Sequence, residues 1–333
     1  MALTKVSRGL LSTGIVDNSN ATAITIDSSE NVGIGTSSPT EALHISSGGL
    51  LIDSYIPNAP ASGTSGFIAD FATLTTRLWS RGDATTRGGF DFVQLESDGG
   101  GQQTAFRIAS DGSLSTPTLG TSNVRFGVNA GNSIVSGGNY NVLVGDEAGT
   151  AITTGDYNTA IGMNAAVALT TGIKNTAIGS TALDSEVAGN YSTAVGMGAL
   201  TAQSQSSDVD VYNVAVGYNA GAAVTTGTRN ILIGGLSGDA LTTGNSNVAL
   251  GYSSLSSDTT GDRSTALGFQ ALAVQNFTSN TDTYNVAVGY NAGTAVTTGV
   301  NNTLIGSLAG DAITTANSIV AVGLAAASAI TTG

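Results

Sequence analysis

The second half of the chain carries one short alternating pattern of hydrophobic and polar residues, repeated many times. A motif of the form Asn-x-Ala-Val-Gly first appears at 141–145, and its closing glycine recurs at intervals of 17 or 21 residues. A fixed short period is typical of a solenoid, in which each repeat forms one coil. The closing glycines are Gly145, Gly162, Gly179, Gly196, Gly217, Gly234, Gly251, Gly268, Gly289, Gly306 and Gly323, and Gly127 closes an imperfect first copy.

The repeats are themselves grouped into blocks. Three intervals of 17 and one of 21 sum to 72 residues, and residues 213–221 recur letter for letter at 285–293. Each block therefore contains one longer coil, with four extra residues. We expect the extra residues to form loops at Gln203–Val211 and Gln275–Thr283 that leave the coil on the same side. This regularity is typical of a rod and serves no catalytic centre.

The alternation within the motif predicts two faces, because side chains two residues apart share one face of a strand. The positions on either side of the alanine are Val, Ile, Leu or Thr, and we expect them to fill the coil interior. The alanine then points outward, where a row of small apolar side chains predicts close approach of another chain around a threefold axis. The predicted trimer interface is Leu143, Ala160, Ala177, Ala194, Ala215, Leu232, Ala249, Ala266, Ala287 and Leu304.

The second half of most coils ends in Thr-Thr-Gly, first at 153–155. Threonine favours strand geometry and glycine permits a turn, so we expect extended backbone followed by a return. A single coil buries too few aliphatic side chains to be stable alone, and stacking on its neighbours must supply the rest.

The chain before the repeats has a different composition. Residues 1–45 contain two short β-like runs, at 23–26 and 31–35, joined by a polar turn. Residues 46–118 hold Trp79 and most of the phenylalanines, and runs such as 90–95 and 105–108 alternate with period two. The sequence thus predicts an all-β protein: an N-terminal segment over 1–45, a small antiparallel β domain over 46–118, and a parallel β-solenoid of 17-residue coils over 119–333.

Composition excludes several classes of function. The net charge is −13, and only four basic residues follow residue 118, so we expect no nucleic-acid partner, since phosphate binding needs clustered Lys and Arg. The chain has no cysteine and therefore no disulfide or thiolate metal site. No apolar run is long enough for a signal peptide or a membrane span. We expect synthesis in a cytoplasm and no membrane insertion.

Three segments resemble known families. Asn-Thr-Ala-Ile-Gly at 158–162 and 175–179, followed by Thr-Thr-Gly, is similar to the head repeats of trimeric autotransporter adhesins, which form trimeric left-handed parallel β-rolls. Residues 31–45, with Asn-Val-Gly-Ile-Gly-Thr-Ser-Ser-Pro and a later Leu-His-Ile, resemble a segment widespread in bacteriophage tail fibres. Arg-Leu-Trp-Ser-Arg-Gly at 77–82 resembles the same fibre proteins. The absence of a leader and an anchor favours the phage family.

The resemblance implies a non-enzymatic, homotrimeric structural fibre of a tailed bacteriophage, located in the virion. Its N-terminus would attach to baseplate, tail or capsid-vertex proteins, and a tip would recognise a host-surface glycan or protein. The chain ends in mid-pattern, so we expect the tip to lie beyond residue 333 in a longer protein. Two alternatives are a bacterial surface adhesin whose solenoid binds glycan or matrix, and a polysaccharide-degrading tailspike.

Residues with catalytic or metal-binding chemistry are few. His44 is the only histidine, and it lies in a strand-like run with no catalytic signature around it. No phosphate-binding loop, nucleophile elbow or zinc motif is present. Acids such as Asp208, Asp210 and Asp311 suit solvated loops better than an ion site. We therefore expect no catalytic residue, no metal and no cofactor, although spacing alone leaves open a carboxylate pair assembled from different coils.

The residue before each repeat asparagine provides the candidate binding positions. Equivalent positions in stacked coils lie ~4.8 Å apart, so these side chains should form a ladder, with Lys174 close enough to Tyr157 and Tyr191 for cation–π contact. Ladder stacking or packing between protomers is the simpler interpretation, and a glycan-binding stripe is the alternative. The same choice applies to Trp79, either a core residue of its small domain or a sugar platform. The candidates are Tyr157, Lys174, Tyr191, Tyr212 and Trp79.

Overall fold

The computed structural model describes residues 120–332 without a break, together with short segments of the chain before them. These segments are 15–16, 22–26, 28–29, 31–34, 38, 43–45, 67–70, 77–80, 90–95, 102–108 and 114–115. The chain divides into two compact units, Met1–Leu114 and Ser115–Gly333. Each unit is described by itself below.

The first unit begins with a four-stranded sheet in the order β1-β2-β3-β4. Its strands are β1 (Ile15–Val16), β2 (Thr22–Ile26), β3 (Val32–Ile34) and β4 (Leu43–Ile45). β2 and β3 are antiparallel and joined through a turn at Ser28 and Ser29, which confirms the two β-like runs that the sequence predicts. β3 and β4 are parallel.

Two antiparallel strand pairs follow in the same unit. β5 (Phe67–Asp70) pairs with β6 (Arg77–Ser80), and β7 (Phe90–Leu95) pairs with β8 (Gln102–Ile108), beside which lies β9 (Leu114–Ser115). The runs of period two at 90–95 and 105–108 are thus strands. Trp79 lies on β6, and its side chain is outside the described residues, as are the aromatic side chains expected in a core there.

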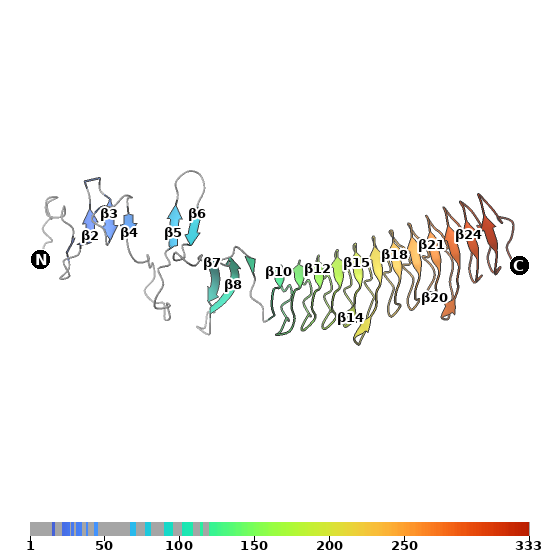
Figure 1. The fold of residues 1–333 in the computed structure, drawn as a ribbon, viewed down its shortest axis with the longest axis horizontal. Helices are drawn as coiled ribbons and strands as arrows, with labels where there is room; N and C mark the ends of the chain where they lie inside the picture. The colour runs from blue at the N-terminus through green and yellow to red at the C-terminus, as the bar shows by residue number, and fades with distance from the viewer. Residues whose placement is uncertain are drawn as a thin grey trace. The chain divides into compact units, whose positions relative to one another are not determined.

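The second unit is a parallel β-solenoid, as the repeat predicts (Figure 1). One three-residue strand from each coil joins a 12-stranded sheet, and every strand pairs in parallel with the strand of the next coil. The strands are β10 (Val124–Phe126), β11 (Val142–Val144), β12 (Thr159–Ile161), β13 (Thr176–Ile178), β15 (Thr193–Val195), β17 (Val214–Val216), β18 (Ile231–Ile233), β19 (Val248–Leu250), β21 (Thr265–Leu267), β23 (Val286–Val288), β24 (Thr303–Ile305) and β25 (Val320–Val322).

The rest of each regular coil consists of turns. The threonines of the Thr-Thr-Gly segments do not belong to strands, and only Gly261 of these segments lies in one, so the strands expected there do not form. The first threonine instead bonds to the next coil: the hydroxyl of Thr153 donates to the carbonyl of Thr170 (3.2 Å), and that of Thr225 donates to the carbonyl of Thr242 (3.1 Å). Within the part of the chain that the structure describes there is no helix, and hence none that could span a membrane.

The closing glycine of the motif is required by the backbone. Gly162 has φ +133°, a conformation that other residues rarely adopt, and a Cβ on it would lie 2.6 Å from the carbonyl oxygen of Gly179. The turn after each strand therefore combines an unusual backbone angle with close contact between successive coils. This explains why the glycine recurs without exception.

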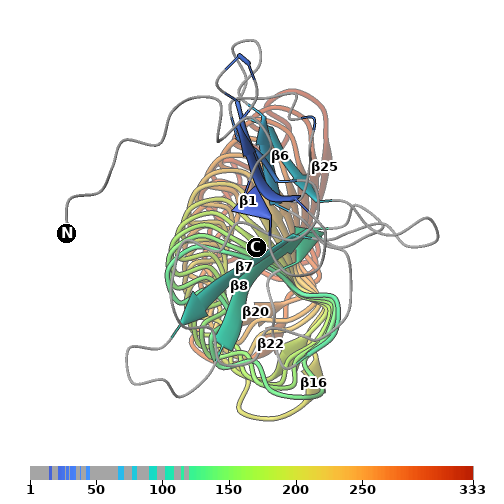
Figure 2. The same ribbon diagram turned by 90° about the vertical axis from the view of Figure 1, so that its left-hand side faces the viewer.

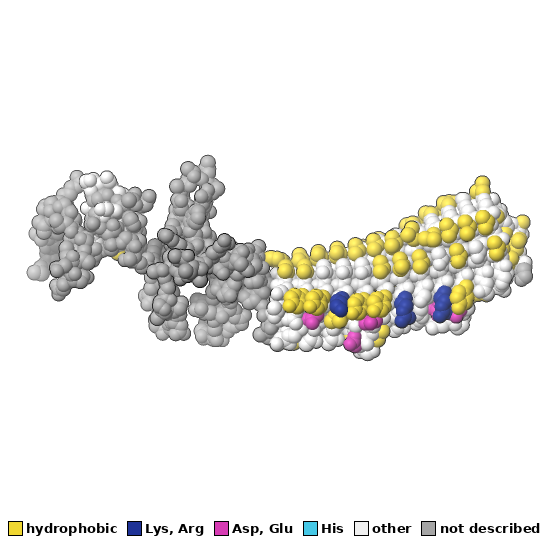
Figure 3. Space-filling view, in the orientation of Figure 1, with side chains coloured by type: hydrophobic (Ala, Val, Ile, Leu, Met, Phe, Trp, Pro, Cys, Tyr) yellow, Lys and Arg dark blue, Asp and Glu magenta, His cyan; other side chains and the backbone are white. Residues whose placement is uncertain are grey.

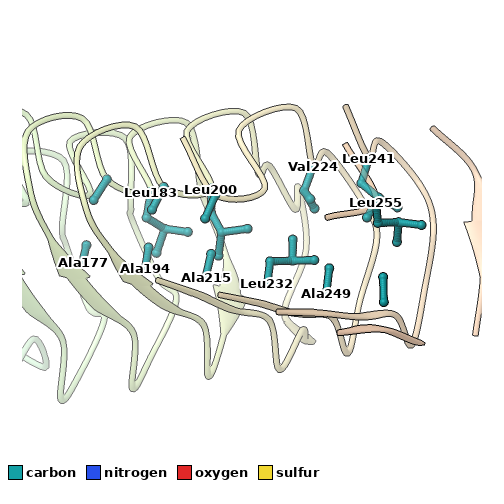
Figure 4. Packing of buried hydrophobic residues seen from close by; sticks show 14 of the residues in the cluster. Ala177, Leu183, Ala194, Leu200, Ala215, Val224, Leu232, Leu241, Ala249 and Leu255 are labelled. Atoms are coloured by element: carbon teal, nitrogen blue, oxygen red, sulfur yellow. The ribbon is translucent and has the colours of Figure 1, made fainter. Parts of the chain in front are cut away.

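The two faces of the strands are the reverse of the prediction. From β11 to β25 the central alanine or leucine of each three-residue strand is buried inside its own coil, as Ala177, Ala194 and Leu232 show (Figure 4). The residues on either side of it point outward and are half-buried or exposed. The proposed trimer interface through Leu143, Ala160, Ala177, Ala194, Ala215, Leu232, Ala249, Ala266, Ala287 and Leu304 is therefore wrong, because those side chains form the core of the monomer.

The physical reason is the narrow interior of the coil. The strand faces a turn that carries its own buried side chains, such as Leu183 or Val224, so only a small residue usually fits between them. Leucine occupies the strand position where the turn has glycine six residues later: Leu143 with Gly149, Leu232 with Gly238, Leu304 with Gly310. A Cβ on Gly149 would lie 2.7 Å from Leu143 Cδ2. The leucine side chain thus occupies the space that a larger residue at the glycine position would need.

The asparagine that opens most repeats is buried and links three coils. The backbone N–H of Asn158 donates to the side-chain oxygen of Asn141 in the preceding coil (2.9 Å), and its Nδ2 donates to the carbonyl of Gly172 in its own coil (2.8 Å). Its own side-chain oxygen accepts from the backbone of Asn175 in the following coil (2.9 Å). The full pattern recurs at Asn141, Asn175, Asn230, Asn247 and Asn302.

Gly238→Ala tests the volume rule. The new Cβ would lie 2.7 Å from Leu232 Cδ2 at a residue with φ +54°, so we expect a loss of about 1–3 kcal/mol in the free energy of unfolding. Gly235→Ala is the matched control, because its Cβ meets no atom nearer than 3.5 Å. Adding Leu232→Ala to Gly238→Ala recreates the native pair Ala160 and Ala166 and should recover stability. Denaturant unfolding that ranks the two single variants equally would contradict the rule.

Asn230→Ala tests the asparagine ladder. It removes the acceptor of the Asn247 backbone N–H and the donor to the Gly244 carbonyl, both buried. At roughly 1–3 kcal/mol for each of the two unsatisfied groups, we expect a total loss of about 2–6 kcal/mol in the free energy of unfolding. Thr171→Ala, at an exposed threonine of another coil, is the control. A loss no larger than that of the control would show that the ladder is not stabilising.

Candidate functional site

The residues that precede the repeat asparagines form the predicted surface ladder. Tyr140 stacks on Tyr157 with ring centroids 4.9 Å apart, and Tyr191 stacks on Tyr212 at 5.1 Å. Between these pairs, Lys174 places its Nζ 4.8 Å from the ring centroid of Tyr191 and donates to its hydroxyl (2.9 Å). That hydrogen bond raises the pKa of Lys174. The stacked tyrosine pairs and the contact of Lys174 with Tyr191 are confirmed, and a role in binding stays a prediction.

A second exposed ladder, which the sequence analysis did not identify, follows the closing glycines. Tyr252 stacks on Phe269 (5.7 Å between centroids), and Phe269 stacks on Tyr290 (5.4 Å). Met163, Met197 and Tyr218 occupy the same position in other coils and are also exposed. The signal was present in the sequence, because large apolar residues recur at the first position after the glycine. The outward strand face thus has an aromatic ladder along each side.

Both predicted loops are present and project from the same edge of the solenoid (Figures 1 and 2). Each returns through a two-residue strand that pairs in parallel with the preceding coil: β14 (Gly189–Asn190) with β16 (Val209–Asp210), and β20 (Gly261–Asp262) with β22 (Thr281–Asp282). The nine residues Gln203–Val211 and the nine residues Gln275–Thr283 have the same sequence of buried and exposed positions. The loops are therefore two copies of one structure.

A buried polar network anchors the first loop. Glu186 is fully buried, and its Oε1 accepts hydrogen bonds from the backbone N–H groups of Gly189 (2.7 Å) and Gln205 (3.0 Å). Its Oε2 accepts from Gln203 Nε2 (2.7 Å). Because Gln205 belongs to the loop, the carboxylate ties the loop to the coil below it.

The same glutamine replaces part of the asparagine ladder. Gln203 Nε2 also donates to Ser192 Oγ (2.8 Å), and its Oε1 accepts from Asn213 Nδ2 (2.9 Å). Ser192 stands where other coils have asparagine and has no side-chain amide to offer. The glutamine thus fills the break in the ladder at the coil from which the loop departs.

The second loop has an equivalent network, 72 residues later. Asp258 Oδ1 accepts from the backbone N–H groups of Gly261 (3.0 Å) and Phe277 (3.3 Å), and its Oδ2 accepts from Gln275 Nε2 (2.5 Å). Gln275 bonds in turn to Ser264 Oγ (2.7 Å) and Asn285 Nδ2 (2.8 Å). Burial raises the pKa of Asp258, against the effect of these hydrogen bonds.

Sequence reasoning missed these networks, although a signal exists. The turn position that contributes the large buried side chain is Ile, Leu or Val in the other coils, for example Ile152, Leu169 and Leu241. It is polar only at Glu186, Gln203, Asp258 and Gln275, in the two coils on either side of each loop departure.

The loops bring acidic side chains to the tyrosine ladder. The hydroxyl of Tyr212 donates to Asp210 Oδ2 (3.1 Å), which raises the pKa of Tyr212, and the hydroxyl of Tyr284 donates to Asp282 Oδ2 (3.2 Å). Asp282 also forms an ion pair with Arg263, whose guanidinium lies 5.7 Å from the ring centroid of Tyr284. The tyrosine, the acid and the loop form one exposed cluster at each of the two positions.

Comparisons of this chain with models of protein families, with curated proteins and with solved structures find no match. Over the described residues, no three His, Cys, Asp or Glu side chains gather in a way that would hold a metal ion.

A charge exchange tests the buried network. Gln203→Glu places a second carboxylate against Glu186, and Glu186→Gln turns a donor toward the Gln203 amide, so each single variant should lose about 3 kcal/mol or more. The double variant restores one donor and one acceptor. Its loss in the free energy of unfolding should therefore be smaller than the sum of the two single losses. A coupling free energy of roughly 1–3 kcal/mol in a double-mutant cycle is expected, and strict additivity would contradict the pairing.

Proposed function

We propose that this chain forms the shaft of a fibre on a tailed bacteriophage and assembles as a parallel homotrimer. The observation that carries the proposal is the outward face of the 12-stranded sheet, where one row of side chains is apolar in every coil and the other is Val or Ile in seven coils and Thr in five (Figure 3). Its two rows hold only Val, Ile, Leu, Phe and Thr. Exposed members include Phe126, Ile161, Ile178, Ile231, Leu250, Ile305, Val320 and Val322.

The size of this face matches a protein interface. Eleven steps of ~4.8 Å give a length of about 53 Å, and the two rows of side chains are roughly 10 Å wide. The resulting area of ~500 Å² per copy gives roughly 1,000 Å² in total, the size at which a specific interface begins. Soluble monomers rarely expose a continuous apolar patch of this size, so the face favours a partner.

A second and third copy of this chain suit the face best. The rows repeat once per coil, and a partner with the same rise per coil can place its own rows in register along the full length. Copies related by a closed threefold rotation cover one another's faces around an axis and leave no open surface for further addition. This keeps the predicted trimer but moves its interface from the alanine row to the Val, Ile and Thr rows.

The shaft role follows from the same architecture. Each coil is bonded to its neighbours by strands, by asparagines and by threonines, so bending would break several ladders at once. The resemblance of 31–45 and 77–82 to tail-fibre segments supports attachment to the virion through the first unit. A host-recognition tip, as expected from the sequence, would then be carried at the far end.

The trimer proposal has a direct test in Val195→Glu combined with Val216→Glu. Both side chains point outward from adjacent strands of the sheet, so a threefold assembly would bring three copies of each charge together. We expect a folded monomer by circular dichroism and sedimentation velocity, whereas the wild type sediments as a trimer. Thr171→Glu with Thr226→Glu, at exposed turn positions, should stay trimeric. A wild-type monomer at micromolar concentration would refute the proposal.

The virion assignment is tested on particles. Antibody labelling of purified phage, followed by electron microscopy, should place this chain on fibres. Labelling of bacterial cell surfaces, with none on particles, would support the adhesin alternative instead.

A further inference from the structure

The two loops are built more rigidly than a shaft requires. Ten coils are held together without a buried carboxylate, and the only fully buried acids among the described residues are Glu186 and Asp258, one beneath each loop. Burying a carboxylate is costly unless it is well hydrogen-bonded, and each of these accepts several hydrogen bonds that fix the loop backbone. Fixed loops on a rigid scaffold are the usual setting of a binding site.

The two loops share their pattern of buried positions, a first glutamine and a late aspartate, and they differ in most of their other exposed residues. Gln203 and Gln275 are buried at the start, and Asp210 and Asp282 recur near the end. Between them the exposed residues are Ser204, Ser206, Ser207 and Asp208 in one loop and Asn276, Thr278, Ser279 and Asn280 in the other. These side chains are hydroxyls, amides and a carboxylate, all of which hydrogen-bond to hydroxyl groups.

Each loop lies beside an exposed aromatic ring. Tyr212 and Tyr284 are about half exposed (48% and 51%), and each is the last aromatic rung of its run, because Arg229 and Asn301 follow. A ring provides a flat apolar surface, and the neighbouring Asp210 or Asp282 provides a hydrogen-bond acceptor. This combination fits a sugar ring, which has apolar C–H faces and hydroxyl groups at its rim.

The charge of the clusters restricts the ligand further. Asp208 and Asp210 stand against Lys174 in one cluster, and Asp262 and Asp282 against Arg263 in the other, so each is net negative. Nucleic acids, anionic lipid surfaces and acidic polysaccharides are disfavoured by this charge. A neutral saccharide is compatible with the charge, the ring and the polar loop side chains of both clusters.

We propose that the loops Gln203–Val211 and Gln275–Thr283, with Tyr212 and Tyr284, form two equivalent binding sites for a neutral saccharide on the flank of the solenoid. The loops project from the edge opposite the strands of the 12-stranded sheet, so a trimer formed through that sheet leaves them accessible (Figure 1). The sites go beyond the shaft role and do not depend on it. Sites that recur four coils apart, about 19 Å, suit a polysaccharide with a repeating unit.

The test uses an array of defined neutral and acidic oligosaccharides, probed with the full chain. We expect binding to a set of neutral oligosaccharides that falls at least tenfold in Tyr212→Leu/Tyr284→Leu. Tyr218→Leu/Tyr252→Leu is the matched control, because these rings are equally exposed but lie on the second ladder, after the closing glycines. The control should bind as the wild type does, and each single loop variant should retain binding with reduced avidity.

The proposal would be overturned if the chain bound no saccharide above background, or if the two tyrosine double variants lost binding equally. A preference of the chain for acidic glycans would overturn it as well. Capture of a protein ligand that free saccharide does not displace would also count against it. Sedimentation of every variant, measured in parallel, reports the trimer separately, so failure of saccharide binding is distinguishable from failure of the shaft proposal.

Discussion

The buried asparagine ladder is the constraint on which the other features of the solenoid depend. An amide inside an apolar core is costly unless its donor and acceptor are used, and here the oxygen of one coil accepts from the backbone of the next while the nitrogen closes its own coil. Both bonds require successive coils to stack in exact register. In that register the carbonyl of each closing glycine lies against the closing glycine of the preceding coil, so no Cβ would fit there. The same register sets the spacing of the strands. One polar residue per coil thus fixes the period.

Inside this frame the volume is shared among three positions of each coil. The strand residue, the left-handed turn residue six places later and the aliphatic residue beyond it cannot all be large. Leucine in the strand therefore faces glycine, whereas alanine faces leucine, alanine or glycine. Some left-handed positions carry leucine, as at Leu183 and Leu200, where the gain in buried apolar surface offsets the backbone strain. Where Glu186 and Gln203 replace the aliphatic residue, hydrogen bonds substitute for packing and one coil lengthens into a loop. The residue type at this core position therefore also determines where a loop leaves the solenoid.

The period, the strand positions, the loops and the tyrosine ladder are all predictable from the sequence, because each repeats in register and each depends on local geometry. The direction of the strand faces is not predictable from hydrophobicity alone, since Val and Ile rank above Ala as core residues. Two clues point the right way: Asn158 and Ala160 share a face, and Leu232 is accompanied by Gly238. Reading them requires knowing that the coil is thin and made of turns. The Glu186 and Asp258 networks depend on contacts between different coils, which a pattern within one coil does not contain.

The 72-residue block then has a physical meaning. Two coils of each block give up their aliphatic core residue to hold a loop, which costs packing. The longer of the two also gives up its asparagine, which interrupts the ladder once per block. The strand face runs past that coil unchanged, since Val195 pairs with Val216 across it in the same register as elsewhere. Assembly through the sheet and variation in the loops are thereby uncoupled. Exposed loop residues such as Ser206 and Thr278 differ between blocks, whereas Asn213 and the eight residues after it recur without change in the next block. The residues that stacking requires are thus the same in both blocks, whereas most solvent-exposed loop residues differ.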